Sequence, residues 1–120
     1  MKIAIPYDRG KIFDHFGHAA YFEIVNVDDG KVIGKMNVPT SGSGHEYMVS
    51  FLKRLKVNVV ISSHMGKKAI MSFLENNIEV YIGLSGGVDD VVSRYLEGTL
   101  DGFNVSNLNL DLLDDQCDCN

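Results

Sequence analysis

The chain has 120 residues, 45% of them apolar and 22% charged, which is typical of one soluble domain with a single hydrophobic core. Its net charge of −5 argues against a nucleic-acid-binding surface, which normally carries a basic stripe. No apolar run approaches the ~20 residues of a membrane-spanning helix, and residues 1–2 lead into a strand pattern rather than a signal peptide. We therefore expect a cytoplasmic protein without nucleic-acid or membrane partners.

Five segments have the composition of β-strands. They are rich in apolar, β-branched and aromatic residues, and they cover residues 2–6, 21–27, 32–38, 57–61 and 78–82. Between the second and third of these, Asp28-Asp29-Gly30-Lys31 predicts a tight hairpin turn. The residues between the first and second segments, 9–19, are expected to form a polar loop.

Three further segments show the spacing of apolar residues that is typical of helices. For the first, Ser43 followed by Glu46 fits a capping box. Asn77 is placed to end the second helix, and Gly98 to end the third.

The order of these elements predicts an α/β fold. Right-handed crossovers place the fourth and fifth strands parallel to the first on one side, and the hairpin places the second and third on the other. The expected result is a three-layer α/β/α, ribonuclease-H-like arrangement with a mixed five-stranded sheet of order 3-2-1-4-5, in which only strand 2 is antiparallel. Residues 1–100 would form one domain, and residues 101–120 a partly ordered acidic tail.

The four histidines are expected at one edge of this sheet. His15 and His18 follow the first strand, His45 follows the third, and His64 and Met65 follow the fourth. In open α/β sheets, ligands bind at the carboxyl ends of the strands. Several neutral imidazoles facing one pocket suit a transition metal or a metal–sulfur cluster. The alternative is that they are ordinary surface histidines of polar loops.

Two other features are candidate binding sites. Ser85-Gly86-Gly87 precedes a helix, so its backbone N–H groups are candidates to bind an anion, although such a loop often only connects two elements. Cys117 and Cys119 offer two soft ligands near the end of the chain. They are too few for a structural zinc site. The pair either belongs to a C-terminal tail without a binding role, or reaches over a cluster bound at the sheet edge that carries the histidines.

The sequence does not favour an enzyme. A two-metal nuclease needs several converging carboxylates. Asp8 is suitably placed for that role, but the fourth strand exits through Ser62, Ser63 and His64 without an acidic residue. We expect no nucleophile elbow of a serine hydrolase, although Gly83-Leu84-Ser85-Gly86-Gly87 matches its G-x-S-x-G spacing.

Several motifs resemble those of the dinitrogenase iron–molybdenum cofactor biosynthesis family, the NifX-like proteins. They are His15-Phe16-Gly17-His18-Ala19-Ala20-Tyr21-Phe22 after Ile3-Ala4-Ile5-Pro6, Val57-Asn58-Val59-Val60-Ile61 leading to Met65-Gly66-Lys67-Lys68-Ala69, and Asn77-Ile78-Glu79-Val80-Tyr81. The resemblance covers residues 1 to about 100 and is closest to single-domain members.

This resemblance implies a non-catalytic protein that binds or carries an iron–sulfur or iron–molybdenum–sulfur cluster, with a cluster donor or acceptor protein as partner. His15 occupies the position of the family's histidine. His15 is the one ligand that the resemblance supplies. Together with the predicted edge, glycine loop and tail, the expected metal ligands are His15, His18, His64, Cys117 and Cys119, and the other expected cofactor-binding residues are Gly17, Met65, Gly66, Ser85, Gly86 and Gly87. The alternative function is a regulatory or interaction domain that binds a small anion at Gly83–Gly87.

Overall fold

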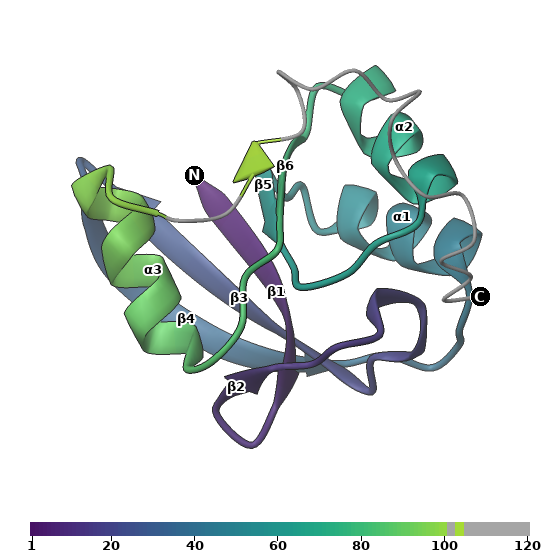
Figure 1. Ribbon diagram of the computed structural model, residues 1–120, viewed down its shortest axis with the longest axis horizontal. Coiled ribbons are helices and arrows are strands. Elements are labelled where there is room, and N and C mark those ends of the chain that lie inside the picture. Colours follow the sequence, from purple (N-terminus) through teal and green to yellow (C-terminus); the bar gives the residue numbers. More distant parts are fainter. Residues whose placement is uncertain (101–102, 105–120) are drawn as a thin grey trace.

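The structure is a computed structural model that describes residues 1–100 and 103–104 (Figure 1). The described strands are β1 (Lys2–Asp8), β2 (Lys11–Ile12), β3 (Tyr21–Asp28), β4 (Lys31–Pro39), β5 (Val59–Ile61), β6 (Glu79–Ile82) and β7 (Phe103–Asn104). The helices are α1 (His45–Arg54), α2 (Lys67–Glu75) and α3 (Val88–Glu97), with a short 3₁₀ turn η1 (Phe16–His18). None of these helices is long and apolar enough to cross a membrane.

All the described strands form one mixed sheet of order β4-β3-β1-β5-β6-β7, and β2 pairs with the end of β1. β3 runs antiparallel to both β1 and β4, whereas β5 and β6 continue parallel to β1. The α/β class and the mixed sheet are therefore confirmed. The expected number of five strands is wrong, because β2 and the antiparallel strand β7 are added.

β2 exists because the chain turns back on itself immediately after β1. Arg9 and Gly10 both have positive φ angles, 52° and 86°, which are the angles of a two-residue hairpin turn. The turn pairs Asp8 with Lys11 and Tyr7 with Ile12. Residues 9–19 are thus not a plain loop, as expected from the sequence, but begin with a hairpin.

Helices cover both faces of the sheet (Figure 1). α1 and α2 bury one face and α3 buries the other, and the period of two along β1 sends Ala4 to the first face and Ile3 and Ile5 to the second. The first core includes Phe16, Phe22, Ile24, Met48, Leu52, Val60, Ile70, Phe73 and Val80. The second includes Val25, Val59, Ile61, Val88, Val91 and Val92.

Of the three helix boundaries predicted from the sequence, the ends of α2 and α3 are confirmed and the start of α1 is not. Asn77 and Gly98, with φ angles of 61° and 78°, lie just beyond α2 and α3, as predicted. The predicted capping box at the start of α1 is wrong. Gly44, with a φ angle of 96°, is the N-cap of this helix, and no side chain caps it.

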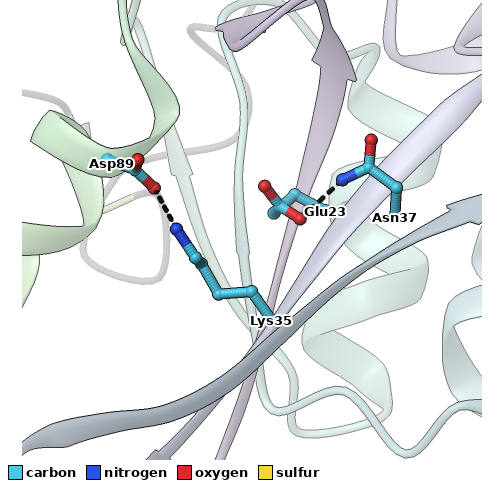
Figure 2. Close-up of polar contacts among 4 residues, drawn as sticks. All are labelled: Glu23, Lys35, Asn37 and Asp89. Carbon is cyan, nitrogen blue, oxygen red and sulfur yellow. Dashed lines mark hydrogen bonds and ion pairs between the residues drawn. The ribbon is translucent and has the colours of Figure 1, made fainter.

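Polar side chains join β4 to its neighbours on the α3 face (Figure 2). The Lys35 ammonium bonds to the Asp89 carboxylate in the first turn of α3 at 2.9 Å, and this interaction raises the pKa of Lys35. Closer to the sheet, the Asn37 amide donates to the buried Glu23 carboxyl group at 2.6 Å. β4 is thereby tied both to the adjacent strand and to the helix above it.

Candidate functional site

Backbone hydrogen bonds link the loops that follow β1, β4, β5 and β6 into one continuous edge. The N–H to carbonyl bonds run from Gly44 to Gly17 (2.8 Å), Ile12 to Gly86 (2.9 Å), Val88 to Gly10 (2.9 Å) and Gly83 to Ser63 (2.9 Å). Each bond connects two segments that follow different strands of the sheet. The edge is therefore held by the backbone itself, whichever side chains it displays.

His15 and His18 lie on a turn of residues 15–18, the histidine turn, which is anchored to the core by Phe16. His18 donates its N–H to the carbonyl of His15 at 3.0 Å, which closes the turn. Between them, Phe16 is 1% exposed and its ring packs edge to face against Phe22 and Phe73, with ring centroids 5.6 Å apart in each pair. Since His15 and His18 are both exposed, the turn buries its aromatic ring and leaves its two imidazoles accessible.

The other two histidines lie on neighbouring loops of the same edge. His45 is the first residue of α1 and is half-buried, directly after the Gly44 that bonds to the histidine turn. His64 is exposed in the loop between β5 and α2. Met65 and Gly17, by contrast, are buried, and their role in binding a cofactor stays a prediction.

The described histidines do not converge on a single ion. Among residues 1–100 and 103–104, no group of three or more His, Cys, Asp or Glu side chains is placed to hold one metal ion. Cys117 and Cys119, and with them the prediction that they are ligands, lie outside the described residues. Ligation of a metal by His15, His18 and His64 therefore stays a prediction.

A hollow of about 500 Å³ lies beside the histidine turn and is open to solvent. It is lined by Asp8, Arg9, Lys11, Ile12, Phe13 and Asp14, so that two cationic and two acidic side chains surround it. The Phe13 ring lies edge-on to the His15 imidazole, with centroids 6.1 Å apart. The hairpin at Arg9 and Gly10 thus creates a recess next to His15 that the sequence did not predict.

The glycine loop before α3, residues 83–87, is hydrogen-bonded to the β1–β2 hairpin. Gly86 has a φ angle of 94°, and its carbonyl accepts a hydrogen bond from Ile12. The Val88 N–H donates to the carbonyl of Gly10. The first turn of α3 carries Asp89 and Asp90, whose negative charges would repel an anion. These contacts favour a connecting role for the loop. Binding of an anion at Ser85, Gly86 and Gly87 stays a prediction.

Sequence analysis missed the loop of residues 40–44 as part of the site. Thr40 donates through its hydroxyl to the carbonyl of Ala19 at 2.7 Å, and Ser41 donates its N–H to the Tyr47 hydroxyl at 2.9 Å. The only signal in the sequence was the run of small residues from Thr40 to Gly44, which is typical of many loops.

The family assignment agrees with this arrangement. The family model described as dinitrogenase iron-molybdenum cofactor matches residues 1–98. The chain belongs to this family. The match includes all four histidines and all the loops of the edge.

Two relatives come from Methanocaldococcus jannaschii. The uncharacterized protein MJ0580 is 30% identical over 108 residues, which cover 86% of this chain and 92% of the relative. The uncharacterized protein MJ0327 is 31% identical over 100 residues, which cover 83% and 91% of the two chains. The crystal structure of MJ0327 has a TM-score of 0.71 and covers 86% of this chain and 94% of its own.

A further solved structure shares the fold at lower identity. It is the apo form of the orange protein from Desulfovibrio gigas, which is 22% identical, with a TM-score of 0.73. The match covers 85% of this chain and 92% of the orange protein. At this identity the likeness concerns the fold alone.

Proposed function

We propose that this protein binds and carries a metal–sulfur cluster, of the iron–sulfur or iron–molybdenum–sulfur kind, as its cargo. The observation that supports this most directly is the hydrogen-bonded edge with His15, His18, His45 and His64 on its loops. Imidazole is a good ligand for iron and other transition metals. Membership of the dinitrogenase iron-molybdenum cofactor family points to the same class of cargo.

The spacing of the histidines favours a cluster over a single ion. One ion needs several ligands within about 2–2.5 Å of itself, and the described residues do not bring three such side chains together. A cluster has several metal atoms, so ligands on different loops can each bind a different one. We therefore assign the role of ligand to His15, His18 and His64, with Cys117 and Cys119 as soft ligands that close over the cargo.

The role we propose is non-catalytic. Loading and release of a cluster require ligand exchange at accessible positions, and His15, His18 and His64 are exposed. A carrier of this kind needs a donor protein that delivers the cluster and an acceptor protein that removes it. The hollow beside His15, with Arg9 and Lys11 on its wall, offers room for part of the cargo.

The test is to purify the full chain without oxygen and to measure iron, molybdenum, copper and labile sulfide together with the visible absorption spectrum. Protein that lacks metal would then be reconstituted with ferrous iron and sulfide, with and without molybdate. The proposal expects bound metal with labile sulfide and visible absorption bands. A colourless protein that cannot be loaded would overturn it, and phosphate titration of the Gly83–Gly87 amides would then test the anion-binding alternative.

A further inference from the structure

Tyr47, in the first turn of α1, is hydrogen-bonded to the loop of residues 40–44. Its hydroxyl oxygen accepts the Ser41 N–H at 2.9 Å and lies 3.2 Å from the Ser41 hydroxyl. These hydrogen bonds from Ser41 lower the pKa of Tyr47. The loop passes so close to the ring that a Cβ on Gly42 would lie 2.8 Å from the Tyr47 Cδ1 atom. A side chain at position 42 would therefore require the ring or the loop to shift.

Both ends of the loop of residues 40–44 are hydrogen-bonded to residues 17–20, at and after the histidine turn. At its start, Thr40 donates its N–H to the carbonyl of Ala20 at 2.9 Å and its hydroxyl to that of Ala19 at 2.7 Å. At its end, Gly44 donates its N–H to the carbonyl of Gly17 at 2.8 Å. Tyr47 holds the middle of a loop whose two ends therefore determine where residues 17–20 lie.

The Tyr47 ring is itself held in place by a row of aromatic side chains. It stacks on Phe51 with centroids 5.8 Å apart and an interplanar angle of 19°. Phe51 contacts Phe22 at 6.2 Å, and Phe22 contacts Phe16 at 5.6 Å. Since Phe16 lies between His15 and Gly17 in the turn, the row runs from Tyr47 to the centre of the histidine turn.

We propose that Tyr47 is a positioning residue for the cargo site. It keeps the backbone of residues 40–44 against the histidine turn, so that the proposed ligands His15 and His18, with the neighbouring His45, stand in one fixed arrangement before the cluster arrives. Preorganised ligands avoid the entropic cost of being ordered on binding. This inference rests on the proposed function, and Tyr47 acts through the loop without touching the cluster.

The first test compares Tyr47→Phe with the parent in anaerobic reconstitution with ferrous iron and sulfide. The variant keeps the ring and its stacking but loses the acceptor for the Ser41 N–H. We expect apparent cluster affinity to fall about 5- to 10-fold, the scale of one hydrogen bond, with an unchanged far-UV circular dichroism spectrum. Gly42→Ala, which pushes a methyl group into the same ring, should weaken loading at least as much. Tyr21→Phe, an exposed tyrosine on β3, is the matched control and should load like the parent.

The second readout separates positioning from general stability. In Tyr47→Phe, the imidazole NMR signals of His15, His18 and His45 should shift, because the loop contacts their segments. The His64 signal should stay in place, since its loop is bonded to the β6 loop through Ser63 and Gly83 instead. If all four signals move alike, or none does, Tyr47 is not a positioning residue.

The outcomes also distinguish this inference from the function on which it rests. If Tyr47→Phe loads like the parent while His15→Ala is impaired, the inference is wrong and the proposed function stands. If the parent does not load, or His15→Ala loads as well as the parent, the proposed site fails and the inference falls with it.

Discussion

Gly44 and Gly17 join the start of α1 to the histidine turn through a single backbone hydrogen bond of 2.8 Å. Gly44 has φ and ψ angles of 96° and 156°, a region that residues with a side chain rarely adopt. His45 follows directly. The relative positions of the two histidine-bearing segments thus depend on a conformation that glycine provides.

We predict that Gly44→Ala lowers the free energy of unfolding by roughly 1–3 kcal/mol, the usual cost of such a backbone conformation. No atom lies within 4 Å of the added Cβ, so the loss would come from the backbone angle alone. Urea denaturation measures it. Gly34→Ala is the matched control, because its added Cβ also meets open space but its φ angle is not positive. Equal effects at both positions would contradict the prediction.

Phe16 is predicted to be the main anchor of the histidine turn. Phe16→Ala should reduce the free energy of unfolding by about 3–5 kcal/mol, because it removes a buried ring that contacts two others. Phe13→Ala, a half-buried phenylalanine beside the hollow, should cost clearly less. The measurement is again urea denaturation, and a similar loss for both variants would argue that the turn is not anchored through Phe16.

The bond between Asn37 and Glu23 is predicted to stabilise the β3–β4 pair. Asn37→Ala removes the amide that donates to the buried Glu23 carboxyl group at 2.6 Å. The expected loss is about 1–3 kcal/mol, the cost of leaving a buried polar group without its partner. Asn26→Ala, on β3 itself, is the control and should cost less. Thermal and urea denaturation would both show the difference.

Stability at alkaline pH is predicted to depend on Tyr95. Burial, followed by the negative charge and hydrogen bond of Glu79, raises the pKa of Tyr95 above its usual value of 10.0. The folded state therefore keeps its proton longer than the unfolded state. This stabilisation is complete below pH ~10 and is lost as the pH rises through the folded-state pKa. Lys35, whose pKa is raised by Asp89, acts in the same direction, and Tyr47, whose pKa is lowered, acts in the opposite one.

Tyr95→Phe should therefore flatten the decline in unfolding free energy as the pH rises above about 10, as measured by urea denaturation. The variant also loses the hydrogen bond to Glu79, which lowers its stability at neutral pH, so the slope and not the absolute value is compared. Tyr21→Phe should keep the slope of the parent. A parent protein that gains stability over this range would contradict the assignment.

The fold was predictable where local signals and the hydrophobic pattern agree. The apolar run of residues 57–61 led to β5, and Asn77 and Gly98 ended their helices in left-handed conformations. The β1–β2 hairpin was missed because its first turn residue is Arg9, and arginine is not a residue that favours positive φ. The N-cap of α1 was misplaced because Ser43 is a residue type that favours the N-cap position. In the structure Gly44 is the N-cap, and its N–H donates to the carbonyl of Gly17.

The placement of the histidine-bearing loops at one edge of the sheet was predictable, but the contacts between these loops were not. Topology alone indicated that loops with histidines share the carboxyl edge of the sheet. The contacts that hold these loops join residues far apart in the chain, such as Gly44 with Gly17 and Gly83 with Ser63, and no local pattern specifies them. The predicted closure by Cys117 and Cys119 lies outside the described residues.

The most direct test of the central claim is anaerobic titration of ferrous iron and sulfide into histidine variants of the full chain, followed by visible absorption. His15→Ala should weaken cluster loading most, His18→Ala and His64→Ala less, and the half-buried His45→Ala least. Far-UV circular dichroism should show that each variant is folded, because these residues contribute little to the core. If all four variants load like the parent while deletion of residues 117–120 abolishes loading, the cargo is held by the C-terminal cysteines and not by the histidine edge.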